Sequence, residues 1–152
     1  MGNVERLQHW LKHYREWKAF IRNNGQMIAN YQKEMELEAA PGTAHYGPGA
    51  TGGGPFQSQE EAALLRKERL QARITALQAR GQAANTKTMA IENALEEMEP
   101  EGRAIIQKRD IEGKQWAAVA AAFGYSDSAV RRKHKALLQE MAGIIFGDSV
   151  EV

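Results

Sequence analysis

An all-α fold is predicted for this chain, with a long helical hairpin or coiled coil followed by a C-terminal helix-turn-helix domain. Three observations predict it. Apolar residues recur at three- and four-residue steps over residues 3–38 and again over residues 57–98. A Gly- and Pro-rich segment separates these two stretches. The last third of the chain combines a short helix of small residues, a turn containing Gly, and a longer helix.

The first long helix is expected over residues 1–39. Its apolar stripe consists of Leu7, Leu11, Tyr14, Ile21, Ile28 and Met35, widened by Trp10, Trp17 and Tyr31. Such a stripe must be covered by another helix. Gly25 and the pair Asn23–Asn24 weaken the middle of the helix, which predicts a kink or break there.

Residues 40–56 are expected to form a linker. Six glycines fall between Gly42 and Gly54, and each Gly costs about 1 kcal/mol inside a helix while each Pro costs about 3 kcal/mol. The segment contains a literal G-x-G-x-x-G from Gly47 to Gly52. A dinucleotide site needs a strand before this motif and a helix directly after it. Neither is predicted here, so the motif does not indicate nucleotide binding.

The second long helix is expected over residues 57–98. Ser58 with Glu61 three residues later forms a capping box that predicts its start. Alternating steps of four and three residues form a heptad seam, which is weakened around Gly81 to Thr88. Its positions are Leu70, Ile74, Leu77, Gly81, Ala84, Thr88, Ile91, Leu95 and Met98. The seam fits an antiparallel hairpin within the chain or a coiled coil between chains, and both options stay open.

The domain at residues 99–146 is expected to begin with Pro100 in the first turn of a helix. That helix should reach Ile111, turn Ala104, Ile105 and Lys108 inward, and end at Gly113. Helices over 114–122 and 127–146 follow. Residues 147–152 are expected to be a short acidic tail.

The segment Trp116–Met141 has the sequence pattern of a helix-turn-helix. Gly124 supplies a turn residue that tolerates positive φ, and Ser126 suits the N-cap of the second helix. Close approach of the two helices is expected at the small residues Ala117, Ala118, Ala120, Ala121 and Ala122. A small core is expected from Trp116, Val119 and Phe123 on one helix with Val130, Leu137 and Met141 on the other.

The opposite face of helix 127–146 is a candidate DNA-binding surface. Arg can bond guanine bidentately, Ser is adaptable, and Lys suits phosphate. We expect Arg131 and Arg132 to read bases, and Lys114, Lys133 and Lys135 to contact phosphates. The candidate DNA-binding residues are Lys114, Ser126, Asp127, Ser128, Arg131, Arg132, Lys133 and Lys135. The simpler alternative is a solvated charged face.

Charge and composition narrow the function classes. The net charge is only +1, but residues 101–146 hold eight Lys/Arg against five Asp/Glu, which is compatible with a local phosphate-binding patch. Cysteine is absent, and His9 and His13 lack further ligands beside them, so we expect no metal site, no cofactor and no enzymatic activity. No apolar run approaches the roughly 20 residues of a membrane helix. We expect no membrane association and a cytoplasmic location.

The C-terminal segment EGKQWAAVAAAFGYSDSAVRRKHKALLQEM resembles the fourth region of bacterial sigma factors, which reads the upstream promoter element. Ser128, Arg131 and Arg132 fall at positions that resemble its base-reading positions. The aromatic-rich first helix and the HYGPG within Pro41–Pro55 make the whole chain similar to the ArpU/RinA-like phage transcriptional regulators.

The resemblance implies a sequence-specific regulator of transcription that activates late phage genes in the cytoplasm of an infected bacterial host. Its expected partners are double-stranded promoter DNA, host RNA polymerase and further copies of the chain, joined through the long helices. Two alternatives stay open: a DNA-packaging protein like a small terminase subunit, and a helical protein-interaction adaptor. The aromatic stripe with Trp10 and Trp17 could also serve as a docking surface for a partner.

Overall fold

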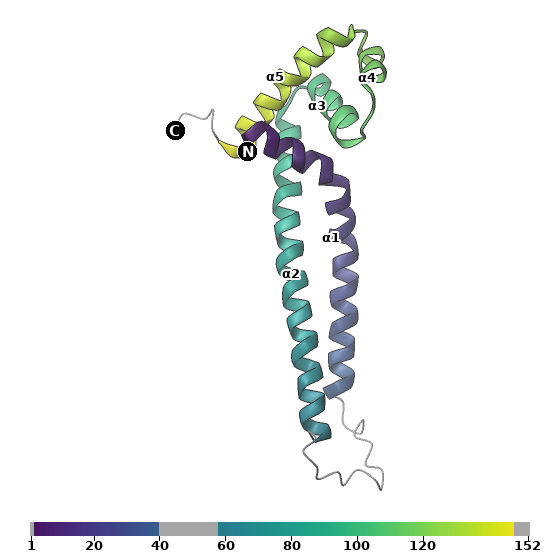
Figure 1. The fold of residues 1–152 in the computed structure, drawn as a ribbon, viewed down its shortest axis with the longest axis vertical. Helices are drawn as coiled ribbons and strands as arrows, with labels where there is room; N and C mark the ends of the chain where they lie inside the picture. Colours follow the sequence, from purple (N-terminus) through teal and green to yellow (C-terminus); the bar gives the residue numbers. More distant parts are fainter. Residues whose placement is uncertain (1, 40–57, 148–152) are drawn as a thin grey trace. The chain divides into compact units, whose positions relative to one another are not determined.

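The computed structural model describes residues 2–39 and 58–147, and every regular element in these residues is a helix (Figure 1). The predicted all-α class is therefore confirmed. The elements are α1 (Asn3–Ala39), α2 (Gln59–Glu97), α3 (Pro100–Ile106), the π-helical η1 (Gln107–Ile111), α4 (Trp116–Phe123) and α5 (Asp127–Phe146). The expected linker at 40–56 and the tail after Gly147 lie outside the described residues.

The chain divides into two compact units, and both long helices pass from one unit into the other. One unit, here called the hairpin unit, comprises Phe20–Ala83. The other, here called the α3–α5 unit, comprises Met1–Ala19 and Ala84–Val152. The sequence pattern predicted the helices but not this division, since it placed residues 1–39 and 99–146 in separate domains.

In the hairpin unit, α1 and α2 run antiparallel and side by side (Figure 1). Ile74 is buried on the seam, and the guanidinium of Arg66 bonds the carboxylate of Glu38 through two contacts of 3.1 Å. The guanidinium of Arg73 lies over the ring of Tyr31. The long helices thus fit a hairpin within the chain, one of the two arrangements that the heptad seam allows. All nine seam positions are buried or half-buried, as expected.

Of the kink or break expected at Asn23–Gly25, a break is absent, because α1 stays helical through these residues. Asn24 is buried, and its Nδ2 donates to the carbonyl of Leu77 at 2.9 Å. Gly81 makes room for it, since a Cβ on Gly81 would clash with that Nδ2. Packing across the hairpin therefore outweighs the weak local helix propensity.

This contact makes the effect of Gly81→Ala depend on residue 24. In the single variant Gly81→Ala, the added methyl group displaces Asn24. The resulting overpacking should cost about 1–3 kcal/mol of stability, which exceeds the gain of about 1 kcal/mol from the higher helix propensity of Ala. In the double variant Asn24→Ala/Gly81→Ala the clash disappears. The buried Oδ1 of Asn24, which finds no hydrogen-bond partner among the described residues, disappears with it. Urea unfolding should show the single variant to be less stable than the parent and the double variant to be more stable. Additive effects of the two substitutions would contradict the contact.

Two apolar clusters form the core of the α3–α5 unit. The larger cluster joins the start of α1 to α2, α3 and α5 through Leu7, Leu11, Ile91, Ala94, Leu95, Met98, Ile106, Leu138, Met141 and Ala142. The smaller cluster lies between α3, α4 and α5 and consists of Ile105, Val119, Ala120 and Val130. Two helices contribute to both clusters: α3 through the neighbours Ile105 and Ile106, and α5 through Val130 and Leu138.

The helix expected over residues 100–111 is only partly α-helical. Pro100 stands in its first turn and Gly113 follows with φ +73°, both as expected, but residues 107–111 form the π-helical η1. Ile105 is buried as predicted, whereas Ala104 and Lys108 are only half-buried. The pattern missed buried Ile106 and Gly102, because α3 is covered on more than one side.

The junction between α2 and α3 is fastened by Arg103. Its guanidinium donates to the carbonyls of Leu95, Glu96 and Met98 at 2.8, 3.3 and 3.2 Å. These carbonyls belong to the last turn of α2 and the residue after it, where intrahelical donors run out. The cation therefore caps α2 and fixes the start of α3.

Candidate nucleic-acid interface

A three-residue turn joins α4 to α5. Gly124 adopts φ +69°, and the N–H of Tyr125 bonds the carbonyl of Ala120 at 3.0 Å. The Oγ of Ser126 accepts the N–H of Ala129 at 3.2 Å, so Ser126 is the N-cap of α5. The predicted turn glycine and the predicted cap are both confirmed. Together they fix the direction in which α5 leaves the turn.

The contact between α4 and α5 involves fewer alanines than the sequence suggested. Of the five alanines expected at the α4–α5 contact, only Ala120 is buried, while Ala117, Ala118, Ala121 and Ala122 are exposed. A helix of eight residues presents one stripe to the core, and Val119, Ala120 and half-buried Phe123 occupy it.

Met141 is also placed differently from the prediction. It is fully buried, but in the larger cluster with Leu11 and Ile106 rather than against α4. The reason is length: α5 has 20 residues and α4 has eight. At about 1.5 Å per residue, the C-terminal half of α5 extends beyond α4.

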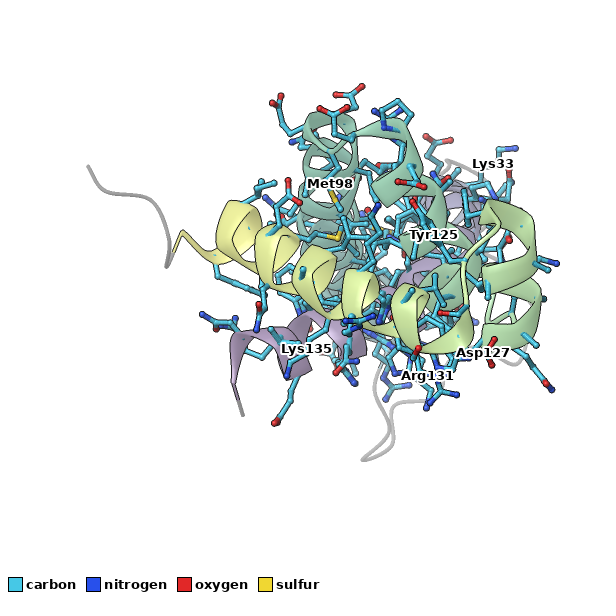
Figure 2. All side chains as sticks on the ribbon, turned by 90° about the horizontal axis from the view of Figure 1, so that it is seen from above. Lys33, Met98, Tyr125, Asp127, Arg131 and Lys135 are labelled. Carbon is cyan, nitrogen blue, oxygen red and sulfur yellow. The ribbon has the colours of Figure 1, made fainter. Side chains whose placement is uncertain are left out.

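The outward face of α5 carries most of the candidate DNA-binding residues. Ser126, Asp127, Ser128, Arg131, Arg132 and Lys135 are all exposed, and so is Lys114 before α4. Figure 2 shows Asp127, Arg131 and Lys135 along one side of α5 and Tyr125 on the other. Within residues 2–39 and 58–147, no carboxylate forms an ion pair with Arg131, Arg132 or Lys135. Their exposure agrees with the prediction, and their role stays a prediction.

Lys133 differs from these residues because it is neutralised within the unit. Its Nζ lies 3.0 Å from Oε2 of Glu101 and donates to the Tyr125 hydroxyl at 2.9 Å, and that hydroxyl donates to Oε1 of Glu101 at 2.6 Å. The hydrogen bonds from Tyr125 and Lys133 lower the pKa of Glu101, and those with Tyr125 and Glu101 raise the pKa of Lys133. Lys133 therefore fastens the turn to α3 and is poorly placed to contact phosphate.

The charge on Glu101 should make this fastening pH-dependent. Because its pKa is lowered in the folded unit, the ionised carboxylate stabilises the fold above the ordinary pKa of 4.5. That stabilisation is lost as the pH falls through the lowered pKa. Glu101→Gln should therefore reduce the unfolding temperature at neutral pH, and its difference from the parent should shrink in acid. Glu97→Gln, a matched change at an exposed position of α2, should have little effect. A difference that is the same at every pH would rule out this role for the charge.

A second cluster surrounds Trp116, the first residue of α4. The guanidinium carbons of Arg109 and Arg131 lie 4.4 and 5.5 Å from the centre of its indole ring. The imidazole of His134 meets the same ring edge-on, with its Nε2 2.6 Å from Oδ2 of Asp110. His134 is buried. This basic residue therefore anchors α5 to η1 instead of facing outward.

Sequence reasoning did not single out Arg109 or Asp110. They lie on the π-helical η1, whose wider turn has no counterpart in a regular helical pattern. Arg109 also donates from Nη1 to the carbonyl of Lys114 at 3.0 Å, which holds the connection between η1 and α4. The sequence feature that could have pointed to these two residues was their proximity to Trp116 in the chain.

The aromatic stripe at the start of α1 is partly covered within its own unit. Trp10 meets the ring of Phe146, and the ammonium of Lys87 lies over the rings of Trp10 and Trp17. Tyr14 donates to Glu92 at 3.0 Å, and burial together with this carboxylate raises the pKa of Tyr14 to about 12. Most of this stripe is therefore engaged in packing.

The His9 and His13 rings lie 4.5 Å apart. Among the residues that the structure describes, no group of three or more His, Asp or Glu is arranged to hold a metal ion. None of the helices in that part of the chain combines the length and apolarity needed to cross a membrane. No protein-family model, curated protein or solved structure matches this chain.

Proposed function

We propose that this chain is a sequence-specific DNA-binding regulator of transcription, of the phage late-gene activator type, acting at promoters in the cytoplasm of an infected bacterial host. The turn and helices α4 and α5 serve as its helix-turn-helix. The observation that supports the proposal most is the separation of charge on α5. Lys133 and His134 meet carboxylates inside the unit, whereas Arg131, Arg132 and Lys135 are exposed and meet none among the described residues.

On a solvated helix face, opposite charges at i,i+4 spacing can pair, for a gain of only about 0.2–0.5 kcal/mol. Asp127 stands four residues before Arg131, yet these two side chains form no ion pair. Arg131 instead lies against Trp116. Side chains left without internal partners are available for an anionic ligand, and DNA offers phosphates at regular spacing with base edges in the groove between them.

In the proposed complex the N-terminal half of α5 enters the major groove. Arg131 and Arg132 donate to the O6 and N7 acceptors of guanine, and Ser128 and Asp127 contact neighbouring base edges. Lys135 and Lys114 contact phosphates on the groove walls, and the capped start at Ser126 lies near the backbone. The resemblance of Ser128, Arg131 and Arg132 to the base-reading positions of sigma region four supports the same orientation. The long helices supply surfaces for a second copy or for RNA polymerase.

Footprinting on the late-promoter DNA of the corresponding phage, repeated over a salt series, tests the proposal. We expect a discrete footprint upstream of a start site, with an affinity that falls as salt rises in proportion to a few phosphate contacts. A footprint confined to a packaging locus, together with a ring of about eight or more subunits in solution, would instead indicate a small terminase subunit. A folded protein without DNA binding at low salt would indicate an interaction adaptor.

A further inference from the structure

The Trp116 cluster contains a second arginine that is placed like a DNA contact. Arg109 comes from η1 and Arg131 from α5, and both guanidiniums lie against one indole. Because both distances are measured to the same ring centre, the two guanidinium carbons are no more than about 10 Å apart. Two elements that are separate in the sequence therefore bring two cations to one place.

These two cations lack a neutralising group within the described residues. The nearby carboxylate of Asp110 is engaged by His134, and neither Arg109 nor Arg131 forms an ion pair in that part of the chain. A guanidinium has five N–H donors, and the structure uses one bond from Arg109, to the Lys114 carbonyl. Two unneutralised cations at this separation repel each other weakly and together attract an anion.

The indole restricts both side chains. An arginine side chain loses rotamer entropy when it binds a ligand, and stacking on an aromatic ring removes part of that freedom in advance. The major groove is about 12 Å wide and 8.5 Å deep. With Arg131 at a base edge on the groove floor, a guanidinium up to about 10 Å away is within reach of a phosphate on the groove wall.

We propose that Trp116 joins Arg109 and Arg131 into one DNA-contacting cluster, in which Arg109 binds a backbone phosphate beside the base that Arg131 reads. This inference rests on the proposed function and adds η1 to the interface. In this arrangement Arg109 increases the affinity for DNA without adding base preference, and Trp116 positions both arginines.

The test compares the salt dependence of binding for the parent, Arg109→Gln and Arg109→Lys. The probes are a duplex that carries the footprinted site and a scrambled duplex of equal length. Loss of one phosphate contact reduces the slope of log K against log salt by about 0.9, which corresponds to roughly eightfold weaker binding at about 0.1 M salt. Arg109→Gln should show this loss equally on both duplexes. Arg109→Lys should restore the slope because it keeps the charge. Arg69→Gln, the same charge change at an exposed site in the hairpin unit, should leave the slope unchanged.

The outcomes separate the two proposals. If the parent shows no preference for the footprinted duplex over the scrambled one, the proposed function fails and this inference fails with it. If the parent shows that preference but Arg109→Gln keeps the parental slope and affinity, the inference is wrong and the proposed function stands. If Arg109→Lys binds as weakly as Arg109→Gln and with the same reduced slope, the role of Arg109 is to hold the η1–α4 connection, and the phosphate contact is also excluded. Thermal unfolding of each variant shows whether the unit remains folded.

Discussion

Replacing Arg131 or Arg132 with Ala is expected to weaken DNA binding by about 1–3 kcal/mol each, or roughly 5- to 150-fold, and to relax base preference at particular positions of the site. Both side chains are exposed on the outward face of α5, and neither meets a carboxylate within the described residues. A bidentate contact with guanine is lost entirely on truncation to Ala. Competition binding against duplexes with single base-pair changes measures the effect.

Two further variants serve as controls for this experiment. Lys135→Ala, on the same helix face, should weaken binding by a similar factor for every sequence, because a phosphate contact carries no base information. Arg69→Ala removes an equal charge from an exposed position of the hairpin unit and should change neither affinity nor preference. If Arg131→Ala and Arg132→Ala both bound the site with the parental affinity and base preference, α5 would not be the reading helix.

Leu11→Ala is expected to destabilise the α3–α5 unit by about 2–5 kcal/mol, the usual cost of truncating a fully buried Leu. Leu11 is on α1, far from α5 in the sequence, but it is fully buried in the cluster that contains Ile106, Leu138 and Met141. The cavity left by the substitution lies in the core that supports α5. All three tryptophans, Trp10, Trp17 and Trp116, belong to this unit, so urea unfolding followed by tryptophan fluorescence reports on it directly.

Leu37→Ala is the matched control, since it makes the same substitution on the same helix at a side chain that is 66% exposed. It should change stability by no more than about 0.5 kcal/mol. If Leu11→Ala left the unfolding midpoint unchanged, the start of α1 would not share a core with α5. Residues 99–146 would then form a domain of their own, as the sequence pattern suggested.

Local features of this fold could be predicted because their causes lie within a few residues of one another. Pro100 suits the first turn of a helix, Gly124 adopts the positive φ that a side chain would oppose, and Ser126 accepts the N–H of a residue three positions later. The heptad seam of α2 is buried or half-buried along its whole length, including the stretch from Gly81 to Thr88 where it was expected to weaken. Periodicity shows which face of a helix is buried, because side chains three and four positions apart share that face.

Periodicity does not show which residues cover that face. The tertiary structure determines them. Leu11 and Met141 belong to one cluster although 130 positions separate them. Glu101 neutralises Lys133 from 32 positions away, and Asp110 engages His134 from 24. The sequence marked the whole basic run of α5 as a candidate surface. Which of its basic residues are left without a carboxylate partner depends on Glu101 of α3 and Asp110 of η1. A Coulomb interaction depends on distance in space, which the order of residues does not specify.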